Sequence, residues 1–318
     1  RNAYFLPPPS ATPRAHAVFI RSIMNHAECI MDVCRGEPKS NYDHLPPPAL
    51  LILSIMFPEM KAAKEWRAFA VKRLMYVLEK TVYADGAEYE LAIGYHSMCA
   101  NAIMKAVALA KKNDIELPRE FLSRFKTMYD FSLHLSHGGM TPPFNDSGRG
   151  SVIPLMKDAY DMWGDERYKF VISEGKQGQR PVEDSYRFPY AGYVVMKNGW
   201  NKNDNCLYFD VGPAGFTHIH EDMLNLYLSA RGSVLLTEVG VYMYDYSKWR
   251  KFSLTTYGHN TIIVDGKAQH RSDVPAACVT KEPLASSWIT TPLFDYASGS
   301  YTNGYQRPKD TLVSAHRV

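Results

Sequence analysis

The stretch Gly215–Gly266 decides the fold and brings histidines and carboxylates together in short blocks. It contains three short blocks, Thr217-His218-Ile219-His220-Glu221-Asp222, Leu235-Leu236-Thr237-Glu238-Val239-Gly240 and Gly258-His259-Asn260-Thr261. The H-x-H of the first block predicts two imidazoles on one face of an extended chain, because side chains two apart in a strand share a side. Paired strands would bring Glu238 and His259 to that face. Such a set is typical of a His/carboxylate metal site with one imidazole to spare, or of histidines hydrogen-bonded at strand ends.

The sequence on both sides of these blocks alternates with a period of two. Short runs of β-branched and aromatic residues separated by turn residues predict strands. The predicted strands are Ala191–Lys197, Cys206–Asp210, Leu224–Ala230, Ser233–Leu236 and Thr261–Val264. Their spacing indicates an antiparallel β-sandwich.

The earlier part of the chain has helical periodicity instead. Apolar residues recur every three or four positions between Pro and Gly punctuation. The predicted helices are Ala15–Cys34, Pro47–Met56, Met60–Tyr83, Tyr89–Lys112, Pro118–Leu135 and Val152–Trp163. Helices joined by short loops indicate a toroid or bundle of helical hairpins. With a Gly- and Gln-rich linker at Glu174–Pro181, the prediction is an α+β multidomain chain, a helical domain at 1–175 and a β domain at 176–318, with the site in the cleft between them.

Bulk composition excludes several classes of protein. A hydrophobic content of 46%, with 22% charged residues and a net charge of +3, is that of a globular protein and gives no basis for nucleic-acid binding. No apolar run reaches the length of about 18 residues that a membrane span needs. The five cysteines are scattered and form neither a disulfide framework nor a CxxC site. The chain starts without Met, and its last residues have the pattern of a β-strand, so the sequence indicates a fragment. The sequence gives no indication of an oligomeric state.

Three polar blocks in the helical half carry further information. They are Lys39–His44, Asp85–His96 and Pro142–Gly150. Alone, each predicts only a helix cap, a half-buried Tyr-His pair or a surface loop. Together with the segments Ala191–Trp200, His218–Asp222 and Gly258–Gly266 they resemble the heparinase II/III-like polysaccharide lyases. The resemblance runs from about Asn41 to the end of the chain and implies part of an α/α toroid followed by part of an antiparallel β-sandwich.

The resemblance also implies roles for individual residues. The toroid Asn falls on Asn41, the catalytic Tyr on Tyr95 with its neighbour His96, the sandwich His on His218, and the metal ligands on His220, Glu238 and His259. The sequence departs from the family pattern where Glu238 replaces a common Asp, where Glu221 replaces a common Ala, and where Tyr42 replaces a His for which His44 is a candidate substitute. Zinc suits two imidazoles and a carboxylate best, with manganese and calcium as alternatives.

The activity implied by the resemblance is β-elimination on an acidic polysaccharide with 4-linked uronic acids, of heparan sulfate, heparin or alginate type. Asn41, with His96 or His44, would neutralise the uronate carboxylate, while Tyr95 would act as acid and either Tyr95 or His218 as base. Arg149 and Arg250 are candidate clamps for carboxylate or sulfate. The resemblance further implies a periplasmic or secreted protein.

Two other functions fit the same sequence. One is an inverting glycoside hydrolase that uses Asp85 or Glu88 together with Asp146, without a metal. The other is a non-catalytic glycan-binding protein. The lyase differs from both because it makes unsaturated products and depends on the hydroxyl of Tyr95.

Overall fold

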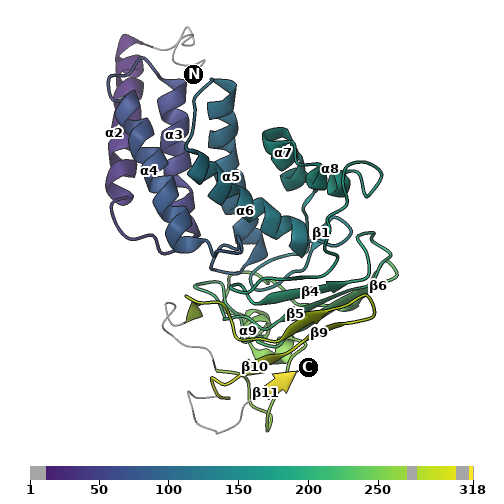
Figure 1. The fold of residues 1–318 in the computed structure, drawn as a ribbon. Coiled ribbons are helices and arrows are strands. Elements are labelled where there is room, and N and C mark those ends of the chain that lie inside the picture. The colour runs from purple at the N-terminus through teal and green to yellow at the C-terminus, as the bar shows by residue number, and fades with distance from the viewer. Residues whose placement is uncertain (1–11, 271–277, 306–314, 318) are drawn as a thin grey trace. The chain divides into compact units, whose positions relative to one another are not determined.

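The computed structural model describes residues 12–270, 278–305 and 315–317 (Figure 1). The chain forms two compact units. One comprises Arg1–Thr81 and Cys99–Arg124, and the other comprises Val82–Met98 and Phe125–Val318. Helices dominate the first half of the sequence and antiparallel strands the second, so the predicted α+β class is confirmed.

The first unit is helical. Its elements are α2 (Pro13–Val33), η1 (Asn41–His44), α3 (Pro46–Met56), α4 (Ala63–Thr81), residues 99–112 of α5 (Ile93–Lys112) and residues 119–124 of α6 (Arg119–Leu135). Local sequence sets the helix starts. The Thr12 side chain accepts a hydrogen bond from the Ala15 amide at 3.2 Å, and Pro residues occupy the first turns of α2 and α3, where their missing N–H costs nothing. Buried side chains such as Leu50, Trp66 and Leu74 form its core.

The second unit contains the remainder of α5 and α6, three further helices and the sheets. The helices are α7 (Ile153–Trp163), α8 (Glu166–Ile172) and α9 (Lys248–Leu254), followed by the turn η2 (Thr256–Gly258). Gly164 ends α7 with φ 66°, a left-handed conformation that favours glycine, and the Asp165 side chain caps α8.

A five-stranded antiparallel sheet is the centre of this unit. Its order is β3 (Tyr186–Arg187), β4 (Tyr193–Lys197), β5 (Cys206–Asp210), β6 (Leu226–Ala230) and β7 (Ser233–Leu236). Separate two-stranded sheets pair β1 (Met140–Thr141) with β2 (Gly150–Ser151), β8 (Trp288–Thr290) with β9 (Asp295–Ala297), and β10 (Gly299–Tyr301) with β11 (Ala315–Arg317). Tyr193 and Tyr208 lie in one buried cluster, while Val194 and Phe209 lie in another. Since neighbouring residues of a strand point to opposite faces, the sheet is covered on both sides.

Most of the predicted elements are present within a few residues of their predicted bounds. All six predicted helices form, whereas α8 and α9 were not predicted. Four of the five predicted strands form, but the prediction of a strand at Thr261–Val264 was wrong. Side-chain hydrogen bonds take the place of backbone pairing there, since Asn260 Nδ2 donates to the Leu226 carbonyl at 3.0 Å and Thr261 Oγ1 donates to the Met223 carbonyl. Among the described residues, no helix is long and apolar enough to cross a membrane.

Candidate functional site

The segment Val82–Met98 of the second unit presents Tyr95. The Asp85 carboxylate accepts hydrogen bonds from the backbone amides of Tyr190 and Ala191 at 2.7 and 2.9 Å, which ties the turn before Tyr95 to the start of β4. Gly86 follows with φ 91°, and a Cβ there would lie 2.0 Å from the Thr127 carbonyl oxygen, so only glycine fits. The segment therefore has one rigid path into the first turn of α5.

His96 is part of this support. Its side chain is buried, Nδ1 lies 3.2 Å from the Glu88 amide that donates to it, and Nε2 lies 3.0 Å from the Met128 carbonyl. Burial lowers the pKa of His96 to about 4, so the ring is neutral at pH 7. With one nitrogen accepting and the other donating inside the unit, this imidazole has no N–H left for a substrate carboxylate. It positions the turn that carries Tyr95.

Tyr95 lies against His218. Their rings stack with centroids 3.8 Å apart and planes 15° apart. The Tyr95 hydroxyl is 2.9 Å from that of Tyr244, which is in turn 3.2 Å from Nδ1 of His218. Burial, and after it the hydrogen bond with Tyr95, raises the pKa of Tyr244, so this phenol keeps its proton. Two hydroxyls and an imidazole thus meet at one point, and Tyr244 is a member that the sequence did not reveal.

The path of the chain at His218 differs from the predicted extended H-x-H. His218 has φ 58°, which is left-handed, and residues 217–222 form no strand. A non-glycine residue in this region stores backbone strain, a feature that concentrates at functional sites. The two imidazoles still converge, because the His218 and His220 rings both reach the carboxylate of Asp146.

Asp146 is the most heavily bonded carboxylate of the site. Its oxygens accept from His218 Nδ1 at 3.1 Å, from His220 Nε2 at 2.9 Å, and from both Nη atoms of Arg250 at 2.5 and 2.7 Å. Burial alone would raise the pKa of Asp146, but these hydrogen bonds together hold it well below the usual range. Arg250, which the sequence proposed as a substrate clamp, has its guanidinium engaged by this carboxylate.

Two further buried carboxyls lie behind His218. Glu90 Oε2 is 3.9 Å from His218 Nε2, and the Glu90 amide donates to Glu88 Oε2 at 3.3 Å. Burial, reinforced by the neighbouring charge of Glu90, raises the pKa of Glu88 well above its usual value. The imidazole of His218 is therefore flanked by a carboxyl group at each nitrogen, Asp146 at Nδ1 and Glu90 at Nε2.

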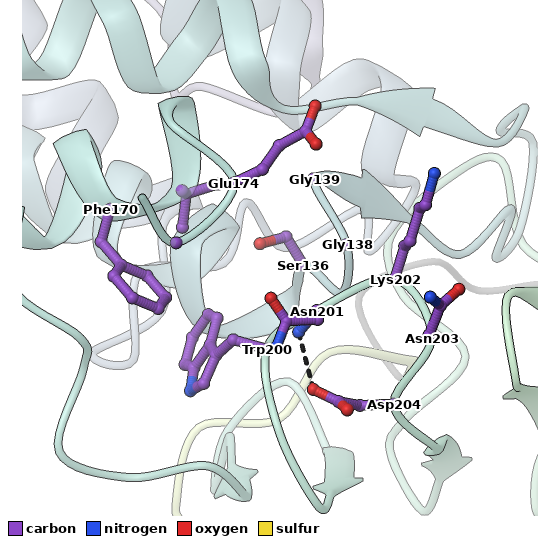
Figure 2. A pocket seen from close by; sticks show the side chains of 12 residues that line it. Ser136, Gly138, Gly139, Phe170, Glu174, Trp200, Asn201, Lys202, Asn203 and Asp204 are labelled. Atoms are coloured by element: carbon purple, nitrogen blue, oxygen red, sulfur yellow. Dashed lines mark hydrogen bonds between the residues drawn. The ribbon is translucent and has the colours of Figure 1, made fainter. Parts of the chain in front are cut away.

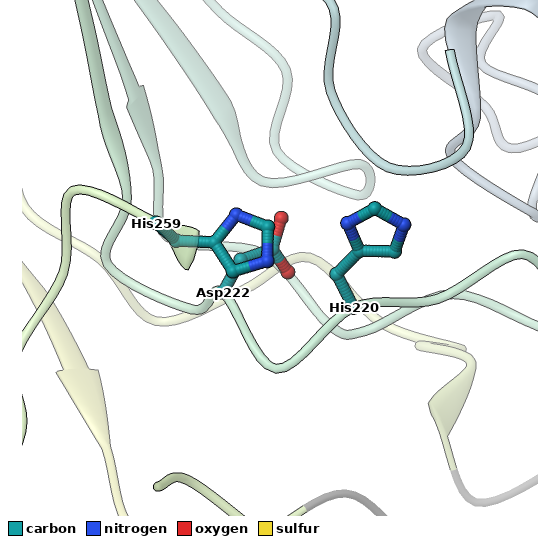
Figure 3. Close-up of side chains that lie close together, drawn as sticks. All are labelled: His220, Asp222 and His259. Atoms are coloured by element: carbon teal, nitrogen blue, oxygen red, sulfur yellow. The ribbon is translucent and has the colours of Figure 1, made fainter. Parts of the chain in front are cut away.

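The side chains of His220, Asp222 and His259 form a second cluster next to this one (Figure 3). One candidate ligand atom from each residue lies within 4.8 Å of the others. Within the described part of the chain, His220 Nδ1, Asp222 Oδ2 and His259 Nε2 are buried without a hydrogen-bond partner. Burial raises the pKa of Asp222, a cost that a bound cation would relieve. Two imidazoles and a carboxylate with unsatisfied atoms fit a divalent metal ion.

The opposite nitrogen of each imidazole is held by a carboxylate. His220 Nε2 contacts Asp146, and His259 Nδ1 is 2.6 Å from Glu238 Oε1. Glu238 Oε2 also accepts a hydrogen bond from the side-chain Nδ2 of Asn225 at 2.5 Å. Carboxylates in this position fix the tautomer and orientation of metal-binding histidines. Glu238, which was predicted as a metal ligand, therefore contacts the opposite nitrogen of His259. Asp222 provides the carboxylate of the cluster instead. The spacing of His218, His220 and Asp222 at every second residue was the feature of the sequence that could have indicated this.

The remaining predicted residues lie elsewhere. Asn41 and His44 belong to the first unit, where Asn41 is buried and His44 Nε2 is 2.8 Å from Thr81 Oγ1. Arg149 is exposed in the second unit. The convergence of Tyr95 with His218 is therefore visible within one unit, and the part played by Asn41 stays a prediction.

A separate concavity lies at one end of the sheet (Figure 2). It is lined by the loop at Ser136–Gly139, the end of α8 and the β4–β5 turn, and has a volume of about 450 Å³. None of the predicted site residues lines it. One of its carboxylates is used within the β4–β5 turn, where Asp204 Oδ2 accepts from the Asn201 backbone amide at 2.8 Å. Its geometry therefore adds nothing to the cluster around Tyr95.

Comparison with known proteins gives this geometry a context. Residues 2–169 match the family model of the heparinase II/III N-terminus, and residues 180–314 match that of the heparinase II/III-like C-terminal domain. A heparin-sulfate lyase of Bacteroides stercoris is 26% identical over 275 residues, covering 83% of this chain and 41% of the relative. One from Pedobacter heparinus is 27% identical over 229 residues, covering 68% and 35%. The chain thus spans less than half the length of these relatives.

Solved structures are similar over the same region. A heparinase III structure superposes with a TM-score of 0.73 at 26% identity, covering 82% of this chain and 42% of the other. A heparan sulfate lyase mutant from Pedobacter heparinus gives a TM-score of 0.77 at 24% identity, covering 92% and 46%. The second comparison shows the fold alone.

Proposed function

This chain belongs to the heparinase II/III family, and on that premise we propose that it carries the catalytic groups of a polysaccharide lyase acting on heparan sulfate or a similar uronate polymer. The observation that carries the proposal is the meeting of the Tyr95 hydroxyl, His218 and Tyr244 at one point. The heparin-sulfate lyases among its relatives support the substrate class and favour it over alginate.

The chemistry is a β-elimination. The bond between C5 and its hydrogen breaks, the bond between C4 and the glycosidic oxygen breaks, and a double bond forms between C4 and C5. The base takes the C5 proton, and an acid delivers a proton to the leaving oxygen. Because a carbon acid next to a carboxylate is weak, the enzyme must also stabilise the charge that develops on that carboxylate.

We assign the acid to Tyr95, whose hydroxyl is at the surface of the cluster. The Tyr244 O–H, 2.9 Å away, can donate to the Tyr95 oxygen and stabilise negative charge there after the proton has left. This support lets Tyr95 also serve as base in a syn elimination. His218 is the base for the opposite epimer, since the Asp146 carboxylate accepts from its Nδ1. Asn41 would neutralise the uronate carboxylate.

We propose further that a divalent metal, most favourably zinc, is held by His220, Asp222 and His259. When bound, it would supply positive charge that compensates the buried carboxylates around it. Its proposed role is structural. His218 lies two residues before His220 on the same loop, so a metal bound by His220 would fix the position of His218. A metal-free protein with unchanged stability and unchanged activity would contradict this role.

The hydrolase alternative has less support. Asp85 accepts hydrogen bonds from two backbone amides, and Asp146 is locked between two histidines and Arg250. An inverting hydrolase needs one free carboxylic acid and one carboxylate that activates a water. Carboxylates bound in this way serve neither task well.

The test is to incubate the intact protein with heparan sulfate, heparin, alginate, hyaluronan and chondroitin sulfate and to follow ultraviolet absorbance of the unsaturated product. A rise on heparan sulfate or heparin that Tyr95→Phe abolishes supports the proposal. New reducing ends without absorbance indicate a hydrolase, and binding without either product indicates a glycan-binding protein. We also propose a periplasmic or secreted location, because polymers of this kind are too large to enter a cell intact; fractionation of the source cells tests it.

A further inference from the structure

We propose that Asp146 is a positioning residue that fixes the tautomers of two histidines at once and thereby couples the metal centre to the catalytic imidazole. One of these histidines is His218 of the candidate active site, and the other is His220 of the metal cluster. The catalytic half of this inference rests on the proposed function; the coupling itself does not.

The geometry of the carboxylate carries the inference. Asp146 Oδ2 lies 3.1 Å from His218 Nδ1, and Oδ1 lies 2.9 Å from His220 Nε2. An ionised carboxylate only accepts hydrogen bonds, so each of these nitrogens must carry a hydrogen. In its neutral form His218 then keeps its lone pair on Nε2, which lies 3.9 Å from Glu90 Oε2, whereas neutral His220 keeps its lone pair on Nδ1. One group therefore imposes opposite tautomers on two rings that are two residues apart.

Each lone pair lies on the nitrogen that the proposed role of its histidine requires. His220 Nδ1 is buried without a hydrogen-bond partner in the described structure and belongs to the cluster with Asp222 and His259. The other tautomer of His220 would direct an N–H at the metal position and prevent binding. For His218, the tautomer that Asp146 selects leaves Nε2 as the nitrogen that can accept a proton. Tyr244 is compatible with it, because its own O–H can donate to Tyr95 while its oxygen lies 3.2 Å from His218 Nδ1.

Asp146 is held firmly enough to transmit a displacement. Its side chain is 1% exposed, and both of its oxygens are bonded by Arg250, at 2.5 and 2.7 Å. Its amide donates to the His218 carbonyl at 3.3 Å, and the neighbouring Asn145 Oδ1 accepts from the His220 amide at 3.1 Å. A cation bound at His220 Nδ1 would make the opposite N–H a stronger donor to Oδ1. Because the carboxylate is a single rigid group, a shift at Oδ1 also shifts Oδ2 and the His218 ring bonded to it.

The first experiment requires no substitution and no substrate. The histidines of the metal-free protein are labelled with ¹⁵N, and the ring nitrogen signals are followed by NMR during titration with zinc chloride. We expect His218 to show Nδ1–H and His220 to show Nε2–H before zinc is added, and the His218 signals to move together with those of His220 as zinc binds. A His218 signal that stays unchanged while zinc saturates His220, or a His218 ring with hydrogen on Nε2, would overturn the inference.

The second experiment uses Asp146→Asn. An amide offers one acceptor and one donor group, so it cannot accept from both rings, and at least one ring loses its hydrogen bond or changes its tautomer. We expect zinc affinity to fall about 10- to 100-fold, as for other groups that orient a metal ligand, and the zinc-dependent movement of the His218 signals to disappear. Calorimetric titration with zinc chloride measures the first effect. Zinc affinity within about twofold of wild type, with the His218 response intact, would contradict the proposal.

Asp165→Asn is the matched control. Asp165 also accepts hydrogen bonds from an arginine, Arg167, and from Lys126, but it caps α8 away from both histidines. It should leave zinc affinity and the His218 signals unchanged. Because zinc affinity and NMR signals need no substrate, a wild-type protein without lyase activity would refute the proposed function while these measurements still decide the coupling. If the wild type is active, Asp146→Asn should lower kcat more than it changes KM.

Discussion

Replacement of Tyr95 by Phe separates catalysis from structure, because it removes one hydroxyl and keeps the ring. The ring stacks on His218 with centroids 3.8 Å apart, and phenylalanine preserves that contact. The hydroxyl bonds Tyr244 at 2.9 Å in an exposed hydrogen bond. Loss of such a bond costs about 0.5–1.5 kcal/mol of unfolding free energy. At about 2–4 °C per kcal/mol for a domain of this size, Tm should fall by no more than about 6 °C.

The expected effect on rate is much larger. A positioned general acid or base contributes about 10²- to 10⁴-fold, which corresponds to about 3–5 kcal/mol of activation free energy. If Tyr95 serves as both acid and base, the loss in kcat lies at the upper end or beyond. The assay is the initial rate of ultraviolet absorbance on heparan sulfate, with thermal unfolding measured on the same preparation.

Tyr246→Phe is the matched control for this measurement. Tyr246 is fully exposed and lies two residues from Tyr244, so its hydroxyl contributes to neither the fold nor the cluster. It should keep wild-type kcat and wild-type Tm. A Tyr95→Phe variant that folds and keeps kcat within about tenfold of wild type would refute the assignment of Tyr95 as the acid, since that is less than a general acid contributes.

Three further outcomes are expected. Asp222→Asn should weaken zinc binding more than Glu238→Gln does, the latter by about 10- to 100-fold, because Asp222 lies in the cluster and Glu238 orients His259 from behind; calorimetry that ranks them the other way would restore Glu238 as the ligand. Chelation should lower Tm by about 5–10 °C relative to protein in metal at 100 times Kd, since such binding contributes about 2.7 kcal/mol; an unchanged Tm would exclude a stabilising metal. His96 has a folded pKa of about 4 against an ordinary 6.5, so its contribution of about 3 kcal/mol is complete above pH 6.5 and is lost as pH falls towards 4. Urea midpoints across that range should fall for the wild type and fall less for His96→Gln, and equal slopes would show that His96 is not the group responsible.

The sequence was sufficient to predict the helices and strands whose apolar residues recur with a regular period. Apolar residues at three- and four-residue spacing predicted α3 and α6 to within one residue, and alternation predicted β5 and β7 with their observed bounds. These patterns are reliable because apolar residues are the buried ones, and buried positions recur with the period of the helix or strand. The short helices α8 and α9, with seven residues each, offer too few turns for a period to be visible.

The partners of the site were harder to predict. His218, His220 and His259 were identified because their spacing is distinctive and because the segments around them resemble the family. Asp146 and Tyr244 were not assigned these roles, because each is far from His218 in the sequence. Their contacts with His218 depend on where the end of each side chain lies in the folded chain.

By itself, the sequence determined that this protein has helices followed by antiparallel strands, and it placed a His-rich block among the strands that follows the heparinase II/III pattern. Only the tertiary structure decided how that block is used. The left-handed backbone at His218 turns an H-x-H away from the geometry of a strand, so strand alternation could not give the directions of its rings. The same holds for the metal cluster, where the arm of Glu238 reaches His259 Nδ1 and the carboxylate of Asp222 lies with the unbonded imidazole nitrogens. Residue types and spacing fix which groups are available, whereas loop conformation and side-chain length fix which atoms meet.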